Sequence, residues 1–440
     1  MRREARPLNT RERPNIIQFI CHDLDRHLGC LGAGVRTPHL DALASQGVLF
    51  DTYCCPAASC SPSRGSIMTG RYPHRNGLIG LAHLGWKLHD EERCLPHCLN
   101  EAEYETHLFG VQHESARPER LGYQQIHNGD GRAEAVSASV AGFLRQRGAG
   151  SAPFYVSAGT FEPHRPYEQE GYAGDDPDEV QPLPWLPDRP GIRADIADLN
   201  GLVKAVDKAV GTICQALDEA GLAASTVLVF TTDHGLAMPR AKGTCYDPGL
   251  KTALIMRWPG RFAAGRRESA LLTNCDFLPT ILELAGAPPA EGLDGRSFAA
   301  LLQGWPYEPR DHVFCEMTWH DQYNPMRAIR TPRHKYIRNF GRRPLVYLPL
   351  DVWQGRAGRE VREEYYGSVR PAEELYDLQH DPGERRNLTL EPTADQAATL
   401  RELRERVQRW MEETDDPLLG GDVPPTPEQE AAIRQWGEAN

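Results

Sequence analysis

The sequence predicts an α/β protein with a large, mostly parallel central sheet flanked by helices and a smaller C-terminal domain. Apolar runs that end in polar residues recur along the chain, and helical patterns separate them. From about residue 311 the pattern changes to short strand-like pieces separated by turns. A chain of 440 residues can bury a large core. We therefore expect a large domain over residues 1–310 and a small one over residues 311–440.

Three segments predict neighbouring strands of the large sheet. Residues 15–23 (NIIQFICHD), 153–164 (PFYVSAGTFEPH) and 225–235 (STVLVFTTDHG) are hydrophobic and run into His, Asp or Glu. Continuous apolar character is typical of buried parallel strands. Ligands gather beyond the carboxyl ends of such strands, so these polar residues are the first candidates for a site.

The predicted helices lie between and after these strands. Residues 37–47 predict an N-capped helix that Gly47 closes, and a second helix begins within residues 64–70, with Ser61 and Ser63 as its caps. A long helix is predicted by an apolar stripe at three- and four-residue spacing: Leu199, Leu202, Val203, Val206, Val210, Ile213 and Leu217.

The small domain is predicted to hold an antiparallel sheet with one packed helix. Its strands are expected at residues 312–317, 326–331, 334–339 and 374–378, and its helix near residues 394–413. The tail after Asp416 is rich in Pro and Gly, and we expect it to wrap the surface.

Composition excludes several classes of function. A net charge of −12 argues against a nucleic-acid partner, although a local basic pocket can still bind a small anion. No apolar run approaches the roughly 18 residues that span a bilayer, so no membrane partner is expected. Residues 1–15 show no apolar leader segment, and the 11 cysteines are scattered, which indicates reduced thiols and a cytoplasmic enzyme.

The stretch from Cys60 to Arg71 carries the clearest chemistry. Pro62 fixes a turn before a predicted helix, and the positive N-terminal end of a helix favours a bound anion. Arg64 adds a permanent guanidinium that suits an oxyanion. On residue types alone, Cys60 is either a functional residue or a buried or capping thiol.

Cys-x-Pro-Ser-Arg followed by GSIMTGRYP resembles the signature of the type I sulfatases, which have an alkaline-phosphatase-like fold. The resemblance implies that a formylglycine-generating enzyme oxidises Cys60 to Cα-formylglycine. Hydrated, this aldehyde is a gem-diol. One hydroxyl attacks sulfur, and the other later loses its proton so that the C–O bond to sulfate breaks.

The same resemblance implies a divalent cation site. The family carries an Asp-Asp pair where this chain has His22 and Asp23, and Asp233 and His234 match a second strand end. These four residues and the modified Cys60 are the candidate ligands. Calcium is the cation expected, with manganese or zinc instead if His22 coordinates, because imidazole is a poor calcium ligand. Two alternatives stay open: His22 points elsewhere, or residues 233–235 form only a turn.

Further candidate catalytic residues follow from the resemblance. His164 is similar to the family histidine that contacts the sulfate or protonates the leaving group, and Lys242 to a lysine that contacts a sulfate oxygen. His113 matches a family histidine, but Val111 stands where the family has lysine. With Arg64, these cationic groups would surround the charge that develops during the reaction.

The chain is most similar to the N-sulfoglucosamine sulfohydrolase (sulfamidase) branch, which serves heparan sulfate degradation. Residues 60–70, 191–199, 323–340 and 410–419 carry this likeness. His320 and Arg327 would then be substrate-binding residues able to meet a carboxylate or sugar hydroxyls, unless Arg327 braces the contact between the domains. Related enzymes are often homodimers, although no residue here specifies an interface.

The resemblance implies hydrolysis of a sulfamate or sulfate ester on a small sulfated sugar such as N-sulfoglucosamine. Carbohydrate O-sulfates and aryl or alkyl sulfates are alternatives within the family. If Cys60 is not modified, the alternatives are a phosphonate monoester hydrolase or phosphodiesterase on the same fold, or a non-catalytic sugar-sulfate binder.

Overall fold

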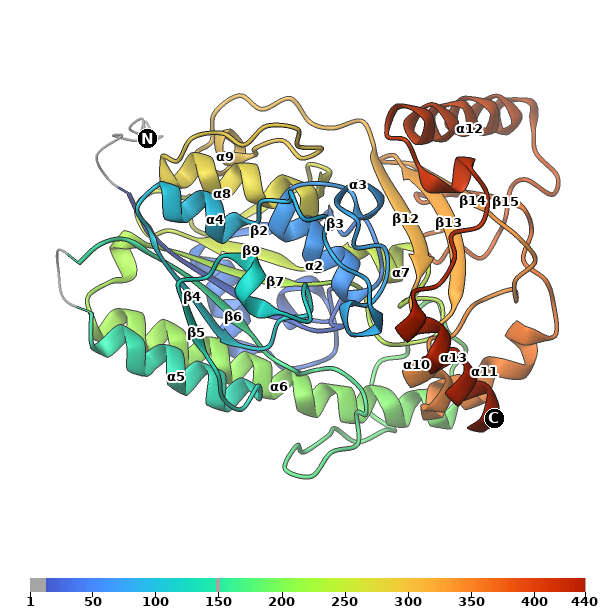
Figure 1. Cartoon of the computed structure of the whole chain (residues 1–440). Coiled ribbons are helices and arrows are strands. Elements are labelled where there is room, and N and C mark those ends of the chain that lie inside the picture. The colour runs from blue at the N-terminus through green and yellow to red at the C-terminus, as the bar shows by residue number, and fades with distance from the viewer. Residues whose placement is uncertain (1–12, 148–150, 440) are drawn as a thin grey trace.

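The computed structural model describes residues 13–147 and 151–439 of the chain (Figure 1). Most of the N-terminal stretch on which the expected lack of a leader rests lies outside these residues. An eight-stranded sheet forms the centre, and only β9 runs antiparallel to its neighbours in it. From edge to edge its strands are β10 (Arg266–Glu268), β2 (Val48–Phe50), β9 (Leu254–Arg257), β7 (Thr226–Thr232), β1 (Asn15–Cys21), β6 (Phe154–Gly159), β4 (Glu105–Gly110) and β5 (Gln125–His127).

The three strands predicted from apolar runs are confirmed as β1, β6 and β7, and they lie side by side. β1 pairs in parallel with both of the others, so that Ile20 lies opposite Gly159 and Cys21 opposite Thr232. Their side chains alternate between two cores. Ile17 and Phe19 belong to one core, and Ile16 and Ile20 to the other. Both faces of the strands are buried, which explains their continuous apolar character.

Helices cover both faces of this sheet, as expected (Figure 1). One face is covered by α1 (Pro38–Gln46), α5 (Ala133–Arg145) and the long α6 (Pro190–Glu219), and the other by α2 (Cys60–Thr69), α4 (Leu95–Glu101), α8 (Phe277–Ala285) and α9 (Ala299–Leu302). The short helices α3 (Pro73–Asn76) and α7 (Asp247–Leu250) lie in connections. A small sheet that the sequence did not predict joins β11 (Leu272–Thr273), β3 (Tyr53–Cys54) and β8 (Lys251–Thr252).

Helix α2 begins earlier than the sequence predicted. Its first residue is Cys60, so Ser61 and Ser63 lie inside the helix and the expectation that they cap it is wrong. Instead, the Ser61 hydroxyl accepts a hydrogen bond from the Ala82 N–H at 3.0 Å, and the Ser63 hydroxyl donates to the Asp233 carbonyl. Pro62 is tolerated because the N–H groups of a first helical turn have no intrahelical partner.

The predicted antiparallel sheet is confirmed in the C-terminal part of the chain. Its strands lie in the order β12 (Val313–Trp319), β13 (Tyr323–Arg330), β14 (His334–Asn339) and β15 (Glu373–Asp377), and α12 (Ala394–Glu413) packs on it. The helices α10 (Leu350–Gln354) and α11 (Arg356–Tyr366) form the connection between β14 and β15. The Glu316 N–H donates to the Pro56 carbonyl at 2.7 Å, so β12 joins the first part of the chain directly. The division at residue 310 stays a proposal.

The tail after Asp416 holds a helix, α13 (Pro427–Ala439), that the sequence analysis did not predict. The Thr426 hydroxyl accepts from the Gln429 N–H at 3.0 Å, which satisfies one N–H of the first turn. Thr-Pro-Glu-Gln is a capping-box pattern with Pro at the first helical position, so a signal was present. In Figure 1, α13 lies beside α10 and α11.

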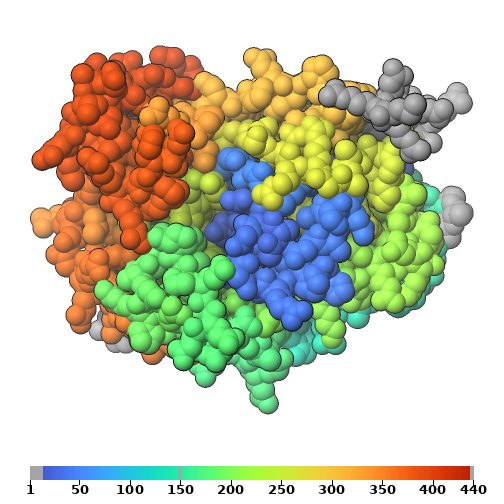
Figure 2. All heavy atoms as spheres, turned by 180° about the vertical axis from the view of Figure 1, so that it is seen from behind, coloured from blue at the N-terminus to red at the C-terminus, as the bar shows by residue number. Residues whose placement is uncertain are grey.

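The rear face brings distant segments together. Figure 2 shows the segment around residues 160–190, in green, between N-terminal residues in blue and C-terminal residues in orange. A cavity of about 380 Å³ lies between Arg26, Trp185 and Pro382. No helix in the part of the chain that the structure describes is long and apolar enough to cross a membrane.

Candidate active site

The polar residues that follow β1 and β7 meet at one edge of the sheet, as the sequence predicted. The Asp23 N–H donates to Asp233 Oδ1 at 2.9 Å, and the Asp25 N–H donates to the His234 carbonyl at 3.0 Å. These bonds tie the two loops together. His22, Asp23, Asp233 and His234 are fully buried as a result.

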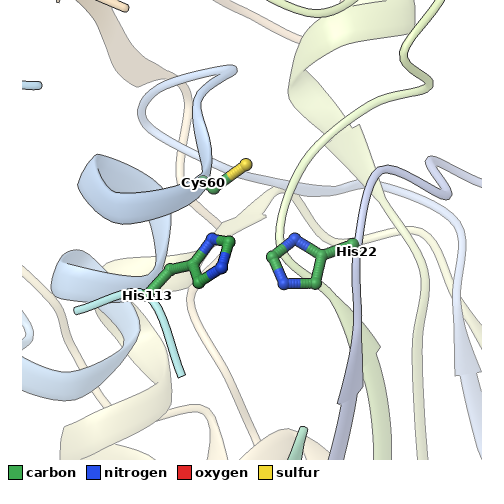
Figure 3. Close-up of side chains that lie close together, drawn as sticks. All are labelled: His22, Cys60 and His113. Carbon is green, nitrogen blue, oxygen red and sulfur yellow. The ribbon is translucent and has the colours of Figure 1, made fainter. Parts of the chain in front are cut away.

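Cys60, the first residue of α2, faces this edge. Its Sγ lies 3.2 Å from His234 Nε2 and 3.7 Å from Asp23 Oδ1. His113, from the segment after β4, stands next to His22 with ring centroids 4.5 Å apart, and Figure 3 shows the two rings side by side near Cys60. A thiol at a helix N-terminus among histidines occupies a position suited to a bound anion.

The donors around Cys60 fit a divalent cation. His22, Asp23, Cys60 and Asp233 each offer a ligand atom, and these atoms lie within 4.8 Å of one another. His22 is fully buried, yet neither ring nitrogen makes a hydrogen bond, although Nδ1 lies 3.1 Å from Asp233 Oδ2. Buried polar atoms without a partner are rare in proteins. A cation between these donors would satisfy the imidazole and both carboxylates.

The hydrogen bonds of His234 also indicate a cation site. Its Nδ1 lies 2.9 Å from the Gly235 carbonyl, and because a carbonyl only accepts, Nδ1 carries a proton. The other nitrogen, Nε2, faces Asp23 Oδ1 at 3.0 Å. Without a cation, this contact requires an imidazolium, and the pKa of His234 is accordingly raised, because the charges of Asp233 and Cys60 outweigh burial. A bound cation would allow neutral His234 to coordinate instead.

Two basic side chains also neutralise the carboxylates. Lys242 Nζ lies 2.8 Å from Asp23 Oδ2 and 2.8 Å from Asp351 Oδ2, and Arg64 Nε lies 2.9 Å from Asp233 Oδ2. Burial would raise the pKa of Asp23, but the charges of Lys242, His164 and His234 together outweigh it and hold that pKa well below its usual range. For Asp233, His234 and Arg64 lower the pKa against burial in the same way. Both carboxylates are charged at neutral pH.

The titration of Cys60 and His113 follows from these charges. Burial would raise the pKa of the Cys60 thiol, but Lys242 and His234 hold it well below the usual value. Burial, reinforced by neighbouring His22, lowers the pKa of His113 to about 4. His113 is therefore neutral at pH 7, beside a residue 60 that carries negative charge.

His164 and His320 complete the surroundings of Cys60. His164 Nε2 lies 3.4 Å from Lys242 Nζ and 3.7 Å from Asp23 Oδ2, and its side chain is 31% exposed. For His320, burial opposes the charge, but Asp321 and Cys60 raise its pKa to about 9. His320 therefore holds its proton at neutral pH.

The structure does not bring Arg327 to this site. Its side chain is fully buried, and its guanidinium bonds to Asp416 and to the carbonyls of Met317 and Met326. All of these partners lie within residues 311–440, so Arg327 neither faces the candidate site nor bridges the two predicted domains.

Asp351 was missed by the sequence analysis. It lies in α10 and contacts Lys242 at the exposed side of the site, with 22% of its side chain exposed. No motif surrounds it, and it is 109 positions from Lys242 along the chain, so only the folded structure brings the two together.

Comparison with known proteins identifies the family. Residues 14–287 match the sulfatase family model. The chain belongs to the sulfatase family. It is a sulfuric ester hydrolase, and its fold is alkaline-phosphatase-like. Residues 235–348 match a second model, N-sulphoglucosamine sulphohydrolase, C-terminal, so this sulfatase is close to the sulfamidase branch.

Relatives that match nearly the whole chain support this family assignment. The sulfatase is 31% identical to an ulvan-active sulfatase of Formosa agariphila over 92% of this chain and 82% of the relative. It is 28% identical to the human N-sulphoglucosamine sulphohydrolase, over 88% of this chain and 87% of the human one. A protein solved in complex with its substrate D-glucosamine-2-N,6-O-disulfate has the same fold. The two structures superpose with a TM-score of 0.72 and 19% sequence identity, and the match covers 92% of this chain and 98% of the other protein.

Proposed function

We propose that this sulfatase removes sulfate from a small sulfated sugar, with N-sulfoglucosamine as the first candidate, and that Cys60 is its nucleophile after conversion to formylglycine. One observation carries the proposal. Cys60 stands at the N-terminus of α2 among Lys242 and several histidines, in the sequence context of the family signature. The human relative and the match over residues 235–348 favour an N-sulfated glucosamine.

Formylglycine at position 60, hydrated to its gem-diol, would supply the hydroxyl that attacks sulfur. Lys242 and His164 would bind sulfate oxygens, a role supported by the 3.4 Å distance between their nitrogens and by the partial exposure of His164. Arg64 holds Asp233 in position and adds positive charge behind the site. Groups fixed in this way need no reorganisation as charge develops on the sulfate. Such preorganised electrostatic stabilisation of the transition state is the largest contribution to catalysis in many enzymes.

His320 and His113 differ in their proton state and therefore in their proposed roles. His320 keeps its proton at neutral pH and donates to an oxygen of the sugar or to the departing atom. His113 is neutral and can accept a proton from residue 60. A divalent cation held by His22, Asp23, Asp233, His234 and residue 60 would supply Lewis-acid charge beside the sulfate oxygens.

The chemistry of the donors favours manganese or zinc over the calcium that the family resemblance implies. The site offers two carboxylates and two imidazoles, whereas calcium prefers six to eight oxygen ligands. We expect the purified protein to retain manganese or zinc on metal analysis. His22→Asp should shift the preference towards calcium, and the surface variant His39→Asp should not. Stoichiometric calcium in the wild type, unchanged by His22→Asp, would contradict this assignment.

Mass spectrometry of the peptide that carries Cys60 tests the nucleophile. In protein from its native host this peptide should be about 18 Da lighter than the thiol form, because oxygen replaces sulfur and two hydrogens are lost. Cys60→Ala should abolish sulfate release and leave the fold intact, whereas Cys214→Ala, a half-buried thiol in α6, should keep activity. An unmodified peptide in a fully active enzyme would refute the proposal.

Substrate choice is tested separately. Sulfate release should be measured from glucosamine N-sulfate and glucosamine 6-O-sulfate side by side. Release from the first supports the sulfamidase assignment, and release only from the second assigns the enzyme to the carbohydrate O-sulfatases.

A further inference from the structure

A second cavity, of about 590 Å³, lies between the C-terminal helix α13, the helices α10 and α11, and the turn between β12 and β13. We call it the aromatic cavity, because its walls include Trp319, Tyr323, Tyr347, Trp353, Tyr366 and Trp436. Figure 1 shows α10, α11 and α13 beside one another at this place. Such a concentration of aromatic side chains around an open cavity is typical of a ligand site rather than of a sealed core.

The aromatic cavity adjoins the candidate active site through three connections. Asp321 lines the cavity and directly follows His320, and Leu350 lines it and directly precedes Asp351. The Leu350 N–H donates to the Asp321 carboxylate, which joins these two walls. Trp436 packs against the apolar cluster that contains Cys60. The walls of this cavity therefore lie next to residues that surround Cys60.

Tyr347 provides a further connection and an unused polar group. A Cβ on Gly243, the residue after Lys242, would lie 2.9 Å from the Tyr347 ring. The Tyr347 side chain is 5% exposed, and its hydroxyl has no hydrogen-bond partner. Because a buried hydroxyl without a partner is costly, this group is a candidate for contact with a ligand.

Arg343 brings charge to the same cavity. Its guanidinium lies over the Tyr323 ring at 5.2 Å, and its Nε is buried without a partner. Among the side chains that the structure describes, in residues 13–147 and 151–436, no carboxylate forms an ion pair with Arg343. An arginine fixed on an aromatic ring and lacking an anion is suited to a carboxylate or sulfate supplied by a ligand.

We propose that the aromatic cavity is a subsite for a second sugar ring, one that bears a carboxylate or sulfate and is linked to the unit whose sulfate is removed. The apolar face of the ring would stack on the aromatic side chains, and its anionic group would pair with Arg343. The inference rests on the proposed function for the identity of the first unit. The residues of α10, α11 and α13 lie beyond the two matched family models, which end at residues 287 and 348.

Kinetics with two substrates test the subsite. The probes are N-sulfoglucosamine and the disaccharide in which this unit is linked to glucuronic acid. The wild type should show a kcat/KM about tenfold or more higher for the disaccharide, since one stacked ring and one paired charge contribute this much or more. Arg343→Ala and Tyr347→Phe should each lower the disaccharide-to-monosaccharide ratio by about five- to tenfold. Tyr307→Phe is the matched control, because Tyr307 also has a buried hydroxyl without a partner, away from this cavity.

Two results would overturn the subsite proposal: a disaccharide-to-monosaccharide ratio of kcat/KM near one in the wild type, or a ratio that neither variant changes. Calorimetry with the unsulfated disaccharide, glucosamine linked to glucuronic acid, decides the same question without turnover. The wild type and Tyr307→Phe should bind it, and Arg343→Ala should bind it about tenfold more weakly. If no sulfate is released from either substrate, the proposed function fails while this binding still supports the subsite. The subsite is refuted if the wild type does not bind the unsulfated disaccharide, or if the wild type, Tyr307→Phe and Arg343→Ala bind it with equal affinity.

Discussion

Lys242 is the residue on which the charge balance of the candidate site depends. It is 1% exposed, and its ammonium group lies at hydrogen-bonding distance from two carboxylates, Asp23 and Asp351. Asp23 belongs to the candidate cation site around Cys60, whereas Asp351 contacts Lys242 and His164, accepts a hydrogen bond from the Val352 N–H, and keeps part of its side chain exposed. Asp351 therefore lowers the positive potential that a sulfate meets on entry, and it restricts which anions the site holds.

Neutralising Asp351 should strengthen the binding of anions. In Asp351→Asn, Lys242 keeps its bond to Asp23 while the site gains one unit of positive charge. Inhibition by inorganic sulfate should become about three- to tenfold stronger at low salt, and the gain should shrink at high salt. Competition assays at two ionic strengths measure this effect. Glu219→Gln, at the far end of α6, changes the net charge equally and should leave inhibition unchanged. Unchanged inhibition in Asp351→Asn would show that the substrate does not meet this charge.

The site residues that sequence could predict are those beside strand ends or within a fixed signature. His22, Asp23, Asp233 and His234 followed from polar residues after buried strands, and the family resemblance added the rest. Asp351 and the position of Arg327 could not be predicted in this way. A carboxylate in a short helix and an arginine in a strand acquire their partners only through contacts between distant segments. Arg327, for example, forms its ion pair with Asp416, which is 89 positions away along the chain.

At the scale of elements, the site depends on how closely β4 and β6 approach each other at their carboxyl ends. The Val111 N–H donates to the Gly159 carbonyl at 2.9 Å, and a Cβ on Gly159 would lie 1.9 Å from the Val111 carbonyl oxygen. Gly110 has a φ of +73°, and a Cβ there would lie 2.3 Å from the Gly159 carbonyl oxygen. This contact holds the segment that carries His113 against the sheet.

Gly159→Ala should therefore move the His113 segment as well as destabilise the fold. A methyl group at 1.9 Å from backbone cannot be accommodated without displacement, so we expect a loss of about 1–3 kcal/mol in stability together with lower kcat. Gly142→Ala is the matched control. This helical glycine in α5 has open space around it, and alanine should stabilise the protein by about 0.5–1 kcal/mol with activity retained. Equal stability and activity of the two variants would refute the argument.

Element prediction succeeded where the hydrophobic pattern was long and regular, as in β1, β7 and α6. It failed at the start of α2, because Pro62 was taken as a turn before the helix although the first helical turn accepts proline. The two-residue strands β3, β8 and β11 have no periodicity of their own and form only by pairing with one another.

At the scale of the whole molecule, a buried ion pair ties the C-terminal tail to the small sheet. Arg327 in β13 pairs with Asp416, and Asp416 Oδ1 also accepts from the Leu418 N–H at 3.0 Å. Beyond this point the chain returns to the candidate site, where α13 lines the aromatic cavity. The pair therefore fixes the start of the tail that closes this side of the molecule.

Removing this pair should weaken the fold without affecting the chemistry. Asp416→Asn removes the carboxylate that bonds to the buried Arg327 guanidinium and leaves Glu316, 3.6 Å away, as an acidic partner, which costs about 3 kcal/mol in the free energy of unfolding. Glu430→Gln breaks an exposed pair with Arg434 in α13 and should cost less than about 0.5 kcal/mol. Urea denaturation measures both, and the kcat and KM of folded Asp416→Asn should match the wild type. A raised KM with unchanged stability would instead assign Arg327 to substrate binding.

The effect of Asp416→Asn should also depend on pH with a defined sign. Burial opposes the charge of Asp416, but Arg327 outweighs it and lowers its pKa in the folded protein. A lowered pKa contributes stability that is complete above the unfolded value of about 4 and is lost as pH falls through the folded value. The stability difference between the wild type and Asp416→Asn should therefore be full at pH 7 and smaller at pH 3. Urea denaturation at both pH values measures it, with Glu430→Gln as the reference. A difference that grows on acidification would show that the pair does not hold Asp416 in its charged form.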